Sequence, residues 1–177
     1  MVLPIGPLMI EHRLIERMIN LINKEVLRIE KENTVDIEFI QKATEFIRNY
    51  ADAFHHGKEE NILFRDLKTK QLKEDHKRIM NELIEEHKLG RKLTKTLINA
   101  RIGYIKGNKE SLTVIINTLK TLAEFYPKHI AKEDKRFFKP IMGYFSIDEK
   151  DQMLKEEEEF DKNFAHFLYN KIITELE

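Results

Sequence analysis

The sequence has no cysteine among its 177 residues. This absence excludes thiol catalysis, cysteine-based zinc fingers, iron–sulfur clusters and disulfide bonds. There is also no glycine-rich phosphate loop, no β-hairpin signal and no repeat of fixed period. Any redox chemistry must therefore use a metal held by histidines and carboxylates, or a cofactor that another molecule supplies.

The chain also lacks net charge, because 31 basic residues balance 31 acidic ones. Without a basic excess to neutralise phosphates, nucleic acid and anionic membranes are not expected as partners. No apolar run approaches the length of a membrane-spanning helix, and residues 1–4 lack the charged and apolar regions of a signal peptide. We therefore expect a cytoplasmic protein.

What the sequence does contain is 41% hydrophobic and 35% charged residues, a balance typical of helical proteins with solvated outer faces. Apolar residues recur at three- and four-residue steps, which predicts amphipathic helices at about 7–31, 36–66, 72–106 and 109–140. Short connections favour antiparallel neighbours, so the expected fold is all-α, an up-down-up-down four-helix bundle over about 7–140. A capping box at Ser146 and Glu149 predicts one appended C-terminal helix, at about 147–176. Residues 1–177 are expected to form a single domain.

Two motifs of the form His-x-x-x-Glu lie on the second and fourth predicted helices, and two more histidines lie on the apolar stripes of the first and third. Residues four apart share a helix face, so the His and Glu of each motif can reach one ion. Burying an unpaired carboxylate costs on the order of several kcal/mol, so carboxylates gathered in a core with imidazoles favour a metal among them. The predicted metal ligands are His12, His55, Glu59, His87, His129 and Glu133.

The second helix offers an alternative register, His56 with Glu60. His55 and Glu59 continue the apolar row of that helix, so they are predicted to face inward and His56 to flank the site, at the surface or in a helix contact. Two further histidines are expected to have packing or surface roles: His76 and His166.

Imidazole and carboxylate ligands suit iron, manganese or zinc. Two carboxylates that can bridge, with two histidines on each side, favour a pair of ions. Each ion would then keep a position for a small exogenous ligand, which suits redox or oxygen chemistry.

The order His, His-x-x-x-Glu, His, His-x-x-x-Glu resembles the hemerythrin-like HHE cation-binding family. The segments that carry the resemblance span nearly the whole chain: 7–13, 55–64, 86–91 and 129–134. The resemblance implies a four-helix bundle with a non-haem di-iron centre, two iron ions per chain, bridged by Glu59 and Glu133. The terminal ligands that it implies are His12, His55, His87 and His129.

Members of this family handle oxygen, peroxide or nitric oxide, sense iron, or repair metal centres. The resemblance therefore implies a protein that handles or senses such a small molecule, and it leaves open whether the protein is an enzyme. The alternatives are a metal-binding sensor or iron-handling module without turnover, a reversible oxygen carrier, and a structural domain that binds zinc.

Two departures from the oxygen carriers of the family bear on these alternatives. Carriers have a second histidine four residues from the one on the third helix, where this chain has Leu83 and Arg91. Carriers also end the last motif in His-x-x-x-x-Asp, and here Asp134 competes with Glu133 for that role. Fewer histidines count against reversible oxygen carriage as the main function. The lack of cysteine disfavours the repair type with an N-terminal cysteine segment.

Overall fold

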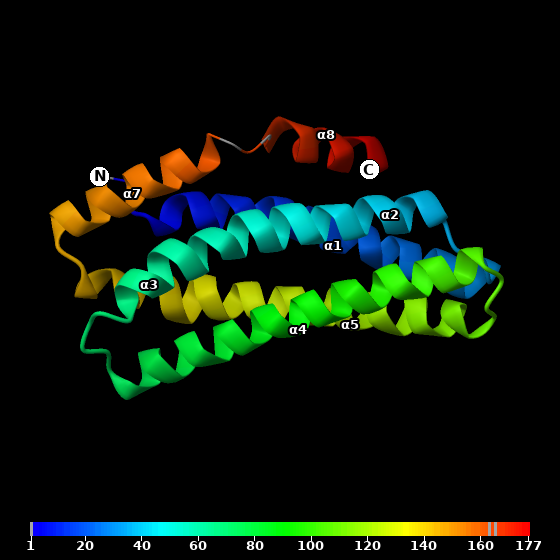
Figure 1. Ribbon diagram of the computed structural model, residues 1–177, viewed down its shortest axis with the longest axis horizontal. Helices are drawn as coiled ribbons and strands as arrows, with labels where there is room; N and C mark the ends of the chain where they lie inside the picture. Colours follow the sequence, from blue (N-terminus) through cyan, green and yellow to red (C-terminus); the bar gives the residue numbers. More distant parts are fainter. Residues whose placement is uncertain (1, 163, 165) are drawn as a thin grey trace.

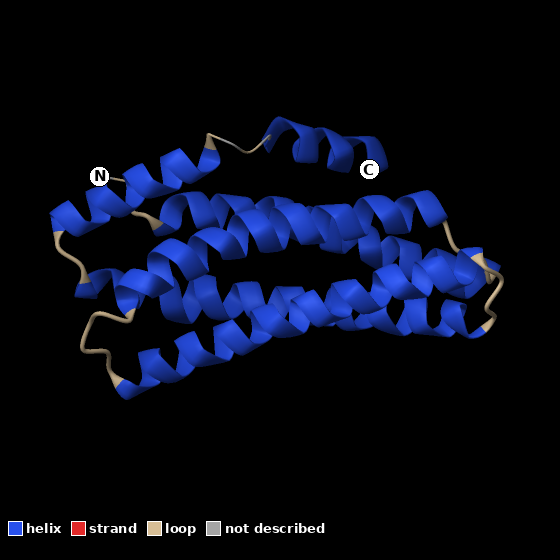
Figure 2. Ribbon diagram, viewed as in Figure 1, coloured by secondary structure: helices blue, strands red, loops and turns tan. Residues whose placement is uncertain are grey.

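The computed structural model describes residues 2–162, 164 and 166–177. These residues form helices joined by short turns, and no strand occurs among them (Figure 2). The helical class that the sequence predicts is confirmed.

The first two helical runs are set by their caps. Helix α1 (Ile5–Glu32) ends at Asn33, whose φ of 57° is in the left-handed region that commonly terminates helices. Asp36 then caps the next run, its carboxylate accepting the Phe39 N–H at 3.0 Å. This second run is continuous and comprises α2 (Ile37–Phe46), η1 (Ile47–His56), η2 (Glu59–Leu63) and α3 (Phe64–Leu67).

The remaining helices follow with short connections. The third run is α4 (Glu74–Ile105). The fourth comprises α5 (Glu110–Lys132), η3 (Glu133–Phe137), α6 (Phe138–Ile141) and η4 (Met142–Tyr144). The segments η1, η2 and η3 are π-helical, whereas η4 is a 3₁₀ turn. Two C-terminal helices complete the chain, α7 (Ile147–Asp161) and α8 (His166–Leu176).

Figure 1 shows the four runs side by side as an antiparallel bundle, with α7 and α8 along one flank. The predicted bundle is confirmed, and so is the capping box, in which Ser146 accepts the Glu149 N–H at 3.2 Å. The prediction of one helix over 147–176 is wrong. Helix α7 packs on η2, whereas α8 packs on α1 and α2, so the two segments follow different parts of the bundle.

The apolar interior consists of two clusters. One gathers around Ile22, Phe46 and Leu119, and the other around Leu8, Phe64 and Phe138. On α1 the fully buried His12 lies between Leu8, which belongs to one cluster, and Ile15, which belongs to the other. The predicted ligands of the other runs lie in the same layer, so a polar layer divides the core.

No helix in the described part of the chain is long and apolar enough to cross a membrane.

Candidate metal centre

All four runs of the bundle contribute to the polar layer. Its members share near-complete burial and a histidine or glutamate side chain: His12 on α1, His55 and His56 on η1, Glu59 on η2, His87 on α4, His129 on α5 and Glu133 on η3. The six predicted ligands are therefore brought together by the fold, and His56 joins them.

These side chains form two groups, within each of which the potential ligand atoms lie within 4.8 Å of one another. The two-histidine group is His12 and His55 with Glu59 and Glu133. The three-histidine group is His56, His87 and His129. The sequence analysis expected two histidines on each side.

The two glutamates reach both groups. Glu133 Oε2 lies 3.2 Å from His12 Nε2, while its Oε1 lies 3.3 Å from His129 Nε2. Glu59 likewise places Oε1 3.7 Å from His55 Nε2 and Oε2 3.3 Å from His87 Nε2. One oxygen of each carboxylate thus faces each group, which is the arrangement that a bridging carboxylate requires.

The prediction that His56 flanks the site is wrong, because its side chain is 1% exposed and its ring stacks on that of His87 with centroids 3.8 Å apart. The cause is the local helix geometry. The Gly57 N–H donates to the Asp52 carbonyl, five residues earlier, as in a π-helix. Wider turns rotate less per residue, so the neighbours His55 and His56 both face inward. The sequence analysis assumed a regular α-helical period, which allows only one of them to do so.

Each of the five histidines has one satisfied and one unsatisfied ring nitrogen. The Nδ1 atoms contact five outer carboxylates, at 2.7–2.8 Å for four pairs and at 3.4 Å for His56 with Asp52. The pairs are His12–Asp134, His55–Glu11, His56–Asp52, His87–Glu60 and His129–Glu86. An ionised carboxylate only accepts hydrogen bonds, so Nδ1 carries a proton, and Nε2 is the nitrogen that offers a lone pair to a metal ion once it is deprotonated. No described residue hydrogen-bonds to any of these Nε2 atoms or to the oxygens of Glu59 and Glu133.

Cations hold the outer carboxylates in turn. Arg13 pairs with Asp134, Lys58 with Glu11, and Lys132 with Glu86. Arg91 contacts both Asp52 and Glu60 at 2.8 Å, so one guanidinium supports the partners of His56 and His87. None of these outer carboxylates is predicted from the sequence to support a histidine, although Glu11, Glu60, Glu86 and Asp134 each adjoin a predicted or alternative ligand.

The pKa values of the histidines show that the layer favours positive charge. Burial acts to lower the pKa of His12, but Asp134 and Glu133 outweigh it and raise that pKa to about 10. Burial likewise acts to lower the pKa of His87. Hydrogen bonds from its ring to Glu133, Glu59 and Glu60 outweigh burial and raise that pKa to about 11. Burial, reinforced by His87 and His129, holds the pKa of His56 well below its usual value, so His56 is neutral. The carboxylates therefore attract positive charge, which protons supply when no metal is bound.

The other histidines lie elsewhere. His76, at the start of α4, places Nδ1 2.8 Å from the Tyr144 hydroxyl, consistent with the packing role predicted for it. The side chain of His166 lies outside the described residues. Leu83 is buried in the apolar cluster around Phe64, and Asp134 supports His12 rather than replacing Glu133.

The layer fits metal ions in its donor chemistry. Seven buried side chains present imidazole nitrogens and carboxylate oxygens that no described residue satisfies, although buried polar atoms are normally paired. Carboxylates on Nδ1 are the usual support of histidines that bind metal through Nε2. The His and Glu clusters thus indicate metal binding.

Comparison with known proteins gives the same result. Residues 3–141 match the sequence profile of the hemerythrin HHE cation binding domain. No match of significance was found among curated proteins or among solved structures. The matched residues contain the whole polar layer, the first three runs and the fourth run as far as α6, while η4, α7 and α8 follow the match. The chain belongs to the hemerythrin HHE cation-binding family.

Proposed function

We propose that this protein holds two non-haem iron ions and handles dioxygen, peroxide or nitric oxide at them. The observation that carries the proposal is that Glu59 and Glu133 each present one oxygen to either histidine group. Paired carboxylates that project from two helices of a bundle, with histidines around them, are a recurrent way to hold two metal ions.

Iron is favoured by the donor set. Imidazole and carboxylate suit iron, and the chain has no thiolate to select a softer metal. When bound, a carboxylate-bridged iron pair supplies electrons to a small oxidant or binds a small diatomic molecule. The protein's own part is to fix the histidine orientations through the outer carboxylates and to exclude bulk water from a buried layer.

The two groups would leave different room for that small molecule. The three-histidine group offers three nitrogens and one oxygen from each glutamate. The two-histidine group offers two nitrogens and the other oxygen from each glutamate. An ion held by the two-histidine group would therefore have one protein ligand fewer and more room for an exogenous ligand.

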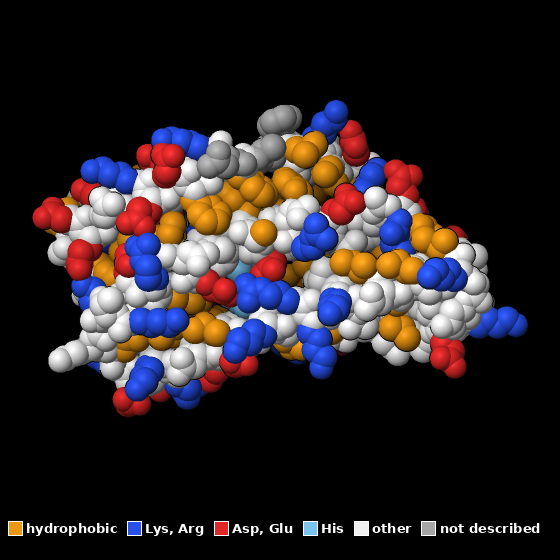
Figure 3. Space-filling view, in the orientation of Figure 1, with side chains coloured by type: hydrophobic (Ala, Val, Ile, Leu, Met, Phe, Trp, Pro, Cys, Tyr) orange, Lys and Arg blue, Asp and Glu red, His pale blue; other side chains and the backbone are white. Residues whose placement is uncertain are grey.

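A surface hollow borders the layer. It has a volume of about 250 Å³, and Asp52 and Arg91, which support His56 and His87, form part of its lining. Arg48 and Lys95 add positive charge to the same lining. Figure 3 shows histidine surface in the gap between the η1–η2 run and α4, with acidic and basic side chains beside it. This hollow is the side from which we propose that a small molecule approaches the centre.

His56 favours a second candidate function, reversible oxygen carriage. The sequence analysis counted four histidines and disfavoured a carrier for that reason. The structure places a fifth imidazole in the layer, on η1 rather than on the third helix, so the shortage of histidines no longer counts against a carrier.

Metal analysis of the untagged protein, together with absorption spectra under air and under nitrogen, tests the proposal. We expect two iron ions per chain and a near-ultraviolet band that changes when the ions are reduced. Zinc at one ion per chain, with a spectrum indifferent to oxygen, would contradict it.

Stopped-flow mixing of the anaerobically reduced protein with oxygen separates the two candidates. A handler is oxidised and stays oxidised when oxygen is removed. A carrier returns to its reduced spectrum under vacuum.

A further inference from the structure

The strongest unassigned feature is a buried lysine that joins helix α7 to the polar layer. Lys58 precedes Glu59, and its side chain is 0% exposed. Its ammonium pairs with Glu11 and lies 2.9 Å from Asp161 Oδ1 on α7. It also lies 4.0 Å from the centre of the Phe54 ring. A hydrogen-bonded chain thus leads from Asp161, through Lys58 and Glu11, to His55 Nδ1.

Helix α7 is seated closely on this part of the layer. A Cβ atom at Gly57 would lie only 3.2 Å from Phe160 Cζ, so the missing side chain gives α7 room to approach. Met153 of the same helix is fully buried in an apolar cluster. Helix α7 follows the residues that match the family profile, so its side of this contact lies outside the matched part of the chain.

Lys58 differs from the other three cations that hold outer carboxylates. Arg13 and Arg91 are more than one-third exposed and Lys132 is partly exposed, so water screens their charges. The charge of Lys58 is shielded from water and therefore acts strongly on its neighbours. Glu11 accepts hydrogen bonds from both Lys58 and His55. Asp161 also accepts a hydrogen bond from Lys58, so it offsets part of the positive charge of the lysine.

We propose that Asp161 is a positioning residue for the metal centre, by which the appended helix α7 strengthens metal binding in the two-histidine group through Lys58, Glu11 and His55. Removing the Asp161 carboxylate leaves the layer one unit more positive, which disfavours a bound cation. It also strengthens the interaction of Lys58 with Glu11, so Glu11 becomes a weaker acceptor for His55 Nδ1. His55 is then a weaker metal ligand. Both effects lower metal affinity.

This inference rests on the metal site of the proposed function but not on its reaction with a small molecule. The test is titration of the metal-free full-length protein with Co²⁺, followed by the visible absorption bands of the bound ion. For Asp161→Asn we expect one of the two ions to bind about 10-fold more weakly, the lower end of the range for removing such outer partners. Asp161→Glu restores the charge and should recover most of the affinity.

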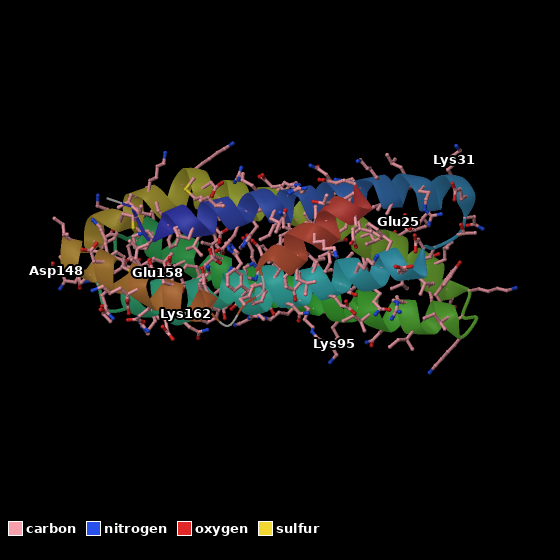
Figure 4. All side chains as sticks on the ribbon, turned by 90° about the horizontal axis from the view of Figure 1, so that it is seen from above. Glu25, Lys31, Lys95, Asp148, Glu158 and Lys162 are labelled. Atoms are coloured by element: carbon pink, nitrogen blue, oxygen red, sulfur yellow. The ribbon has the colours of Figure 1, made fainter. Side chains whose placement is uncertain are left out.

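The matched control is Glu158→Gln. Glu158 is an exposed carboxylate on the same helix, labelled in Figure 4, and its substitution should leave both affinities unchanged. Two further variants test whether Asp161 acts on the two-histidine group. Asp161→Asn should still weaken binding in His56→Ala, and should have no further effect in His12→Ala, where the two-histidine group is already disrupted.

Three outcomes would overturn the inference. They are equal affinities in wild type and Asp161→Asn, equal weakening of both ions, and loss of the folded state in Asp161→Asn by circular dichroism, which would make Asp161 merely structural. A wild-type protein that binds no Co²⁺ would overturn the proposed function as well. Two bound ions in wild type with no reaction toward oxygen, peroxide or nitric oxide would overturn the proposed function and leave this inference intact.

Discussion

The two histidine groups use the same device in different surroundings. In both, a carboxylate on Nδ1 orients each imidazole and a cation holds each carboxylate. In the three-histidine group the cations are Arg91, which lines a surface hollow, and Lys132, which is partly exposed. In the two-histidine group one cation, Lys58, is sealed beneath α7. Ligand orientation is thus achieved in the same way in both groups, whereas among the described residues a fully buried supporting cation occurs in the two-histidine group alone.

The largest effect is expected from Glu133→Ala, because this carboxylate serves both groups. We expect loss of both ions, measured by elemental analysis. We also expect a fall in apparent stability of at least about 3 kcal/mol at saturating metal, since bound metal stabilises the folded state. The control is Glu85→Ala, an exposed glutamate on α4 that should keep both ions. Retention of one ion by Glu133→Ala would show that the carboxylate does not bridge.

The next effect separates the two groups directly. His12→Ala leaves the two-histidine group one nitrogen, whereas His56→Ala leaves the three-histidine group two. We therefore expect one ion to bind at least about 100-fold more weakly in His12→Ala, and about 10-fold more weakly in His56→Ala. Metal titration of the two variants measures both values. Unchanged affinities in His56→Ala would return His56 to the flanking role that the sequence suggested.

The third prediction concerns a buried acid on the two-histidine side. Glu157 of α7 is 2% exposed, and no described residue hydrogen-bonds to its carboxyl oxygens. Burial raises its pKa to about 8, although Lys58 nearby acts to lower it, and Glu11, Asp161 and Glu59 add to the rise.

The sign of the pH effect follows from this shift. Below pH 4.5 the folded and unfolded chains both hold the proton, so Glu157 costs no stability. Between pH 4.5 and about 8 the unfolded chain alone ionises, so stability falls as the pH rises, and it levels off above about 8. Glu157→Gln should therefore gain up to about 5 kcal/mol relative to wild type between pH 4.5 and 9 in urea unfolding. A difference that does not vary with pH would contradict the assignment.

The smallest effect is expected from Arg91→Ala, on the three-histidine side. Arg91 supports Asp52 and Glu60 together, so its loss loosens His56 and His87. Its exposure to water limits the cost, and we expect a loss of affinity of about 5- to 10-fold for one ion. Lys95→Ala, which removes a cation from the same hollow without touching either carboxylate, is the matched control. A larger loss in Lys95→Ala than in Arg91→Ala would mean that general positive charge, rather than carboxylate orientation, matters here.

Much of the fold could be predicted from the sequence because it depends on local signals. The apolar stripes and the caps at Asp36 and Ser146 each involve residues a few positions apart, and the structure has both caps. The break between α7 and α8 depends on where each helix packs on the bundle, which no local signal shows.

The candidate site was predictable where the α-helical period holds, and not where it fails. His12 and His87 lie on regular helices, and their inward direction follows from their stripes. His56 lies in a π-helical turn, and its sequence carries no marker of that geometry. The outer carboxylates were missed for a different reason. Glu11 supports His55 across 44 residues, a pairing that requires the assembled bundle.

The polar layer also has a consequence for cooperativity. It separates the apolar interior into two clusters, so each end of the bundle has a hydrophobic core of its own. Ions bound in this layer would link side chains from all four runs at the boundary, and unfolding of one end would then remove ligands contributed by the other. Because each end has its own apolar cluster, we expect the two ends to open as separate cooperative units when no such link is present. Phe160 of α7 packs against both clusters, so it provides an apolar contact between the two ends that does not depend on metal.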